Sequence, residues 1–169
     1  IISIPLIGAL SHKDSMGNKR AIEVGEVQVM SAGIGITHSE FNDSKTDEVN
    51  FLQLWIIPEE MSVEPYYEQR EFPFEGMKNQ LQTIVAPKNK LEGDALPISQ
   101  QAYIYRTILD ADNTIDLNLK SDKNGLYIFV VDGEISLEHN SLSSRDAIGV
   151  YDTDQVSINA NKNSELVII

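Results

Sequence analysis

The feature that most constrains the fold of this chain is its division into short segments rich in apolar and β-branched residues. Turn-forming residues separate these segments, as in the run from Asp14 to Asn18. Residues 27–30 alternate between apolar and polar side chains, as a half-buried strand does. Many short strands divided by turns are typical of β-sandwiches and barrels. The sequence therefore predicts an all-β fold.

The predicted strands fall into two groups, separated by residues 59–78. This stretch lacks alternation and carries Pro65 and Pro73, so we interpret it as a linker between modules at 1–58 and 79–169. Residues 4–10 resemble 129–135, since each run reads as a strand, a Gly turn and a new strand, which favours an internal duplication. The predicted strands are 1–10, 21–24, 27–30, 36–41, 51–57, 80–85, 102–109, 114–119, 126–131, 134–138, 147–151, 155–158 and 165–169.

Composition excludes several classes of function. Asp and Glu total 26 against 13 Lys and Arg, a formal charge of −13, which disfavours direct binding to nucleic acid or to an anionic membrane. The chain has no cysteine, hence no thiolate metal site and no cysteine nucleophile, and this fits a cytoplasmic protein. Apolar runs are too short for a transmembrane helix.

Both ends of the sequence are apolar. The chain opens with Ile1-Ile2-Ser3-Ile4 and ends on residues 166–169, Leu-Val-Ile-Ile, whereas natural termini are usually polar. Each end reads as the middle of a buried strand. We therefore expect the parent protein to extend beyond these ends, chiefly upstream.

The sharpest candidate for chemistry is the pair His38 and Glu40. If residues 36–41 form a strand, these side chains lie two apart and project from one face, where both can reach one point inside a barrel. An imidazole and a carboxylate suit Fe(II), Mn(II), Ni(II), Co(II) or Zn(II). Ile34 and Ile36 would share that face and keep the site small and largely dry. A polar strand end facing solvent is the alternative for an isolated His-x-Glu pair.

A longer context favours the metal site. Residues 25–40, GEVQVMSAGIGITHSE, resemble the central signature of the pirin family. The runs HKDSMGN at 12–18, LQLWI at 52–56 and PYYEQR at 65–70 also resemble that family. The likeness is strong over residues 1–74 and continues more weakly to the end.

The resemblance implies a bicupin, two jelly-roll-like β-barrels, of which the first is incomplete in this chain. It also implies one divalent transition metal, Fe(II) first, with Ni, Co, Cu, Mn or Zn as alternatives, bound by three histidines and one glutamate. Two of these ligands map onto His38 and Glu40, and the other two belong to a His-x-His motif expected upstream of Ile1. His12 is not a ligand in the family pattern, and we interpret it as structural or exposed.

The remaining candidates are supporting residues. Gln53 lies among apolar neighbours that imply burial, so we predict that it supports the metal site or lines its pocket. Met30 is predicted either to line the same pocket or to pack in the core. In the second module His139 lies in a predicted hairpin turn, and residues 155–159 carry no imidazole. The second barrel is therefore predicted to be free of metal.

Two functions are compatible with the resemblance. The first is a quercetin 2,3-dioxygenase-like oxidoreductase that cleaves a flavonol with O2 and releases CO, with Glu40 as the base that removes the 3-hydroxyl proton. Missing upstream ligands would compromise this activity in the chain alone. The alternative is a non-enzymatic metal-binding regulator that acts through a protein partner, for which the acidic surface would suit a basic protein.

Overall fold

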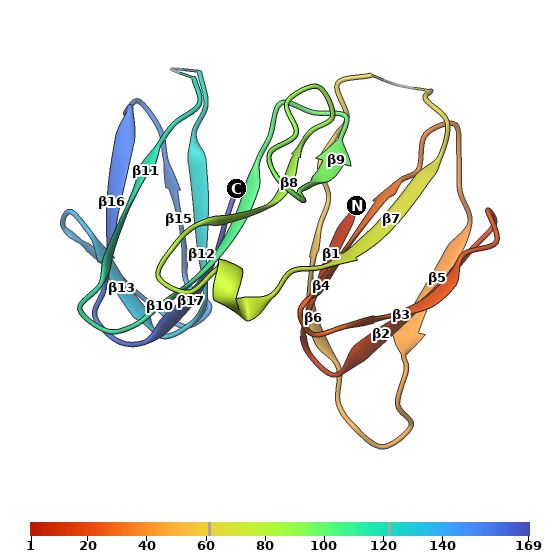
Figure 1. Ribbon diagram of the computed structural model, residues 1–169, viewed down its shortest axis with the longest axis horizontal. Helices are drawn as coiled ribbons and strands as arrows, with labels where there is room; N and C mark the ends of the chain where they lie inside the picture. The colour runs from red at the N-terminus through yellow and green to blue at the C-terminus, as the bar shows by residue number, and fades with distance from the viewer. Residues whose placement is uncertain (61, 122) are drawn as a thin grey trace. The chain divides into compact units, whose positions relative to one another are not determined.

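A computed structural model describes residues 1–60, 62–121 and 123–169 of the chain, which fold mainly into antiparallel β-strands (Figure 1). The chain divides into two compact units. The first comprises Ile1–Pro73 and Ile84–Ala102, and the second comprises Phe74–Thr83 and Tyr103–Ile169. Within the described residues, no helix has the length and apolarity needed to span a membrane.

The first unit contains a four-stranded and a three-stranded antiparallel sheet. The four-stranded sheet has the order β6-β1-β4-β7 and the three-stranded sheet the order β3-β2-β5. Strand β9 runs parallel to β8 and packs against β4 and β7. The strands are β1 (Ile2–Ile7), β2 (Ala9–Asp14), β3 (Lys19–Glu23), β4 (Glu26–Ser31), β5 (His38–Asn42), β6 (Asn50–Leu54), β7 (Tyr66–Glu71), β8 (Gln82–Pro87) and β9 (Leu96–Ile98).

A glycine turn separates the first two strands, so β1 belongs to one sheet and β2 to the other. Gly8 lies at φ +70°, and a Cβ at this position would lie 2.4 Å from the carbonyl oxygen of Glu48. Only glycine accepts both the left-handed backbone and this close approach. The sequence pattern predicted one strand over residues 1–10, whereas the structure breaks it at this glycine.

The second unit is a two-sheet sandwich around an apolar core. One of its sheets contains β15-β12-β17-β10 in that order, and the other has the order β11-β16-β13-β14. Leu109, Ile128, Ile135, Ile158 and Leu166 are fully buried in the core. The elements are η1 (Phe74–Gly76), β10 (Ile104–Leu109), β11 (Thr114–Asn118), β12 (Leu126–Asp132), β13 (Glu134–Leu137), β14 (Asn140–Ser143), β15 (Ala147–Val150), β16 (Gln155–Ala160) and β17 (Ser164–Ile168).

The structure divides the chain differently from the sequence prediction. The predicted linker over residues 59–78 contains strand β7, which pairs with β4 along its whole length from Glu26↔Glu71 to Ser31↔Tyr66. Five of the six β7 residues are half-buried, so no apolar-polar alternation marks the strand. The segment 84–102, assigned to the second module, belongs to the first unit.

Candidate metal centre

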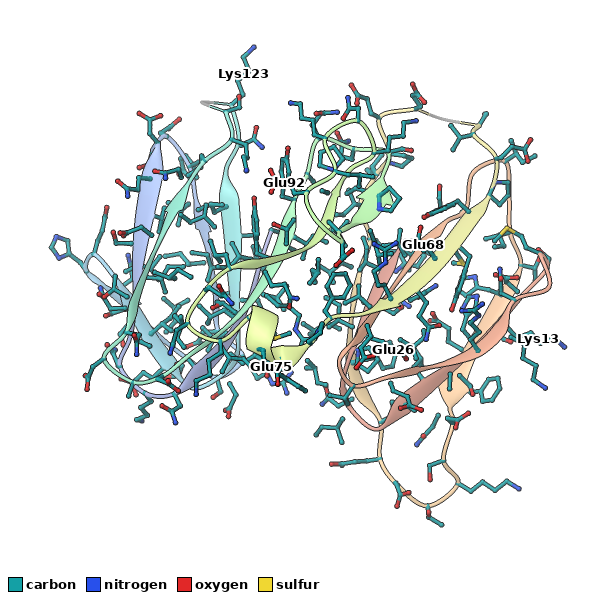
Figure 2. The ribbon with its side chains drawn as sticks, viewed as in Figure 1. Lys13, Glu26, Glu68, Glu75, Glu92 and Lys123 are labelled. Atoms are coloured by element: carbon teal, nitrogen blue, oxygen red, sulfur yellow. The ribbon has the colours of Figure 1, made fainter. Side chains whose placement is uncertain are left out.

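Strands β2 and β5 bring four chemically active side chains to one face of the three-stranded sheet. Their register pairs His12 with Glu40 and Asp14 with His38. Residues directly opposite each other in an antiparallel pair project to the same face, and so do residues two apart on one strand. His38 and Glu40 therefore share a face, as the sequence predicted, and His12 and Asp14 join them there. Figure 2 shows Lys13, between the last two, pointing outward.

Both oxygens of the Glu40 carboxylate have neighbours from the four-stranded sheet. Gln53 Nε2 on β6 donates to Oε2 at 2.6 Å, and Ser3 Oγ on β1 donates to Oε1 at 3.5 Å. His12 Nδ1 lies 3.7 Å from the same Oε1. These contacts orient the carboxylate through its short bond to Gln53 and leave Oε1 less tightly bound. The contacts also place Glu40 between the two sheets, inside the first unit.

His12 is buried, with only 1% of its surface exposed, so the alternative of an exposed residue was wrong. Its ring lies 4.9 Å from the ring of Tyr67 and 5.8 Å from that of His38. Its Nε2 donates to Asp14 Oδ2 at 3.1 Å. The sequence placed His12 at the start of a hairpin but did not show that β2 turns this position inward, beside Glu40.

Asp14 anchors both His12 and the β2–β3 turn. Its Oδ1 accepts hydrogen bonds from the backbone N–H groups of Met16 and Asn18, each at 3.0 Å, and its Oδ2 accepts one from Asn18 Nδ2 at 2.8 Å. Burial alone would raise the pKa of Asp14, but the hydrogen bonds from Asn18, His12 and Met16 together lower it below the ordinary value of 3.8. The ionised carboxylate fixes the proton of His12 on Nε2.

Gln53 donates a hydrogen bond to Glu40, but it is exposed rather than buried. Strand β6 lies at the edge of its sheet, so its apolar sequence neighbours do not enclose the amide. Gln53 Oε1 accepts a hydrogen bond from Trp55 Nε1 at 2.9 Å. The Trp55 side chain, 73% exposed, lines a largely apolar cavity of about 680 Å³ within the first unit, which Met30 also lines. A hydrogen-bonded path therefore runs from Glu40 through Gln53 to a wall of this cavity.

The expected dry wall made by Ile34 and Ile36 does not form. Strand β5 begins at His38, two residues later than predicted, and residues 32–37 form a turn and an irregular stretch. Gly33 lies at φ +51° and Gly35 at φ +135°, which extended strand geometry does not allow. The Ile34 side chain is 67% exposed as a result.

A row of polar side chains crosses the four-stranded sheet on the face toward Glu40. The register pairs Ser3 with Gln53 on β6 and with Gln28 on β4, and it pairs Gln28 with Gln69 on β7. The Gln28 side chain is fully buried. Sequence reasoning gave Gln28 no role, although its place between Val27 and Val29 marked it as a polar residue within a buried strand.

The donors present fit part of a transition-metal site. Across residues 1–60, 62–121 and 123–169, no group of three His, Cys, Asp or Glu side chains is arranged to hold a metal ion. An imidazole and a carboxylate on one strand face nonetheless form a donor pair suited to a divalent transition metal. His139 lies in the turn between β13 and β14, as predicted, and is exposed.

Comparisons with known proteins agree with this architecture. Residues 1–56 match the family described as "Pirin", and residues 83–169 match the "Quercetinase C-terminal cupin domain". The chain is 34% identical over 168 residues to the quercetin 2,3-dioxygenase of Escherichia coli, covering 99% of the chain and 70% of that protein. It is 37% identical over 164 residues to a putative quercetin 2,3-dioxygenase of Zymomonas mobilis, covering 96% of the chain and 68% of that protein.

The fold is similar to that of a solved relative. The crystal structure of the bacterial pirin YhhW from Escherichia coli, in complex with nickel(II), superposes with a TM-score of 0.90 at 33% identity. That match covers 99% of this chain and 69% of the other. The predicted all-β bicupin fold is therefore confirmed. With two family matches and relatives above 30% identity, the chain belongs to the pirin family.

Proposed function

We propose that this protein is a metal-dependent dioxygenase that cleaves flavonols in the manner of quercetin 2,3-dioxygenase. The observation that carries the proposal is the environment of Glu40, whose carboxylate is oriented by Gln53 and connected through Trp55 to a cavity wall. The names of the relatives support the same reaction. The reaction would take up O2, open the central ring of the flavonol and release CO.

Glu40 would act as the general base. The strong bond from Gln53 occupies Oε2, while Oε1 has only a 3.5 Å contact with Ser3 and no bond to His12 Nδ1. Oε1 is thus the oxygen free to take the flavonol 3-hydroxyl proton, provided that the substrate hydroxyl comes within hydrogen-bond reach.

The cavity of about 680 Å³ would hold the planar body of the substrate. Its volume lies within the range of about 300–1,000 Å³ that is usual for small-molecule sites. Trp55, Ile57 and Tyr66 line it and provide apolar and aromatic contact for a ring system. Trp55 is bonded to Gln53, so a ring resting against Trp55 would lie near the residue that orients the base.

His38 and Glu40 would contribute two ligands to a divalent metal, Fe(II) or Ni(II) first. We propose that two histidines encoded upstream of Ile1 complete the set, which the gene sequence ahead of Ile1 tests directly. The chemistry that such a metal supplies is Lewis-acid stabilisation of the deprotonated substrate oxygen. A crystal structure of a relative in complex with nickel(II) supports a metal in this fold.

The test is turnover by the protein as its gene encodes it, loaded separately with Fe(II), Ni(II), Co(II) and Cu(II). Loss of flavonol absorbance and uptake of oxygen should proceed together with at least one metal. His38→Ala should abolish turnover because a ligand is lost. Glu40→Gln should lower kcat by about 10²–10⁴-fold, the usual contribution of a general base.

Matched controls lie in the second unit, where His139 and Glu138 are exposed at a turn. His139→Ala and Glu138→Gln should leave turnover unchanged. A fully active Glu40→Gln variant would show that another group removes the proton. If no metal supports turnover while the protein forms a stable complex with a basic protein, the dioxygenase proposal fails and the regulator is favoured.

A further inference from the structure

Gln28 is a fully buried amide that bonds to none of the residues the structure describes. Its side chain has 0% exposure, and neither Oε1 nor Nε2 has a hydrogen-bond partner among the residues that the structure describes. Buried amides are almost always bonded, because an unsatisfied donor or acceptor away from water costs about 1–3 kcal/mol. An amide that carries this cost in the middle of β4 is therefore a candidate for binding a ligand.

The amide projects into the interior that contains Glu40. Gln28 pairs directly with Ser3, so the two side chains lie on the same face one strand apart. Ser3 Oγ reaches Glu40 from that face. Gln28 is therefore separated from the proposed base by a single side chain.

The other polar side chains of this row are already engaged. Ser3 donates to Glu40, and Gln53 bonds Glu40 and Trp55. On the other side of Gln28, Gln69 Oε1 accepts from Tyr67 Oη at 2.8 Å, and Gln69 Nε2 donates to Ala21 and Glu26. Gln28 alone retains both a free donor and a free acceptor facing the interior.

We propose that Gln28 is a specificity-determining residue that binds the polar end of the substrate, an inference that rests on the proposed function. Its Nε2 would donate to the ligand oxygen that gives its proton to Glu40 and to the carbonyl oxygen beside it. This donor selects planar phenols with a hydroxyl and a carbonyl on adjacent carbons, as in a 3-hydroxyflavone. Such a ligand supplies the acceptors that the buried Nε2 lacks.

Met30 provides the connection to the cavity. It lies two residues from Gln28 on β4, hence on the same face, and it is one of the residues that line the cavity of about 680 Å³. A methionine side chain is unbranched and adapts readily to new neighbours. Movement of Met30 would allow the polar end of a ligand to pass from the cavity to Gln28 while its apolar body stays against Trp55.

The test combines stability with binding. In metal-free protein, Gln28→Leu should raise Tm, because it removes two unsatisfied polar atoms from the interior. In Ni(II)-loaded protein under nitrogen, the same variant should bind 3-hydroxyflavone about 10-fold or more weakly, as judged by fluorescence titration. It should also lose the preference of the wild type for 3-hydroxyflavone over flavone, which lacks the hydroxyl. Gln28→Met tests the same loss with an unbranched side chain.

Gln69→Leu is the matched control, since Gln69 lies in the same row with its amide bonded. It should lower Tm and leave the preference for the hydroxylated ligand intact. If Gln28→Leu and Gln28→Met bind both flavones as the wild type does, or if both variants lower Tm, the inference about Gln28 is overturned while the proposed function stands. If the wild type itself binds no flavone, the proposed function and the inference fall together.

Discussion

Replacing Asp14 with Asn tests whether this carboxylate holds the β2–β3 hairpin and His12 together. The amide oxygen of Asp14→Asn keeps the two backbone bonds to Met16 and Asn18, but its NH2 group faces two donors, Asn18 Nδ2 and His12 Nε2. Two hydrogen bonds to a charged group are lost, at about 1.5 kcal/mol each. His12 can recover part of this by moving its proton to Nδ1, so we expect a net loss of about 2 kcal/mol.

Hydrogen exchange measured by mass spectrometry reports this loss locally. Peptides spanning β2 and β3 should exchange about 30-fold faster in Asp14→Asn, which is the 2 kcal/mol difference expressed as an equilibrium constant. Peptides spanning β12 in the second unit serve as the internal reference. Asp47→Asn, at an exposed position in the same unit, should change the free energy of opening of the hairpin by less than about 0.5 kcal/mol. Equal exchange in Asp14→Asn and wild type would refute the anchoring role.

The same residue gives a pH dependence with a defined sign. The pKa of Asp14 in the folded protein lies below its ordinary value of 3.8, so between these values the unfolded chain binds more protons than the folded one. The stability contributed by Asp14 is therefore complete above pH 3.8 and is lost as the pH falls through the folded pKa. The difference in stability between wild type and Asp14→Asn should narrow over this acidic range, and a constant difference would contradict the assignment.

Three further predictions concern the rest of the chain. Burial, the largest cause, and nearby carboxylates raise the pKa of Tyr67 to about 12, so its contribution to stability should be lost as pH rises from 10 to about 12. Tyr67→Phe should remove the part of the ultraviolet absorbance change that titrates near pH 12, and an unchanged titration would contradict this. Gly33→Ala should lower the free energy of unfolding, measured in urea, by about 1–3 kcal/mol, because it strains a residue at φ +51° and places Cβ 2.1 Å from Val63 O. An unchanged free energy of unfolding would refute the contact. Glu165→Ala should lower the free energy of unfolding by about 3 kcal/mol, because it leaves the Arg106 guanidinium buried without its carboxylate. A decrease below about 1 kcal/mol would show that the pair is dispensable.

The strands of the second unit could be predicted closely because most of them bury one face. In β16, from Gln155 to Ala160, buried and exposed residues alternate without exception. The period-2 pattern is then visible in the sequence. Strand β14 (Asn140–Ser143) was missed because it is polar and short, with only Leu142 buried.

The first unit was harder to predict because part of its interior is polar. Strand β7 is half-buried and carries no alternation, and β9 has only three residues. The pair His38 and Glu40 could be placed on one face from spacing alone. The approach of His12 to Glu40 could not, because it depends on the register between β2 and β5, and register is set by pairing across 28 residues of sequence rather than by local pattern.

The short stretch between Gly33 and His38 sets which side chains β5 turns inward. Gly33 is held against Val63, and Ile34 N–H donates to Val63 O at 2.9 Å, so the stretch is fixed at its start; the pairing with β2 fixes its end. An insertion or deletion of one residue here would turn the side chains of His38 and Glu40 to the outer face of the sheet and those of Ser39 and Phe41 to the inner face. Changes in length are therefore tolerable in the 43–49 loop and not in 34–37, where a single added codon would delete the site in one step.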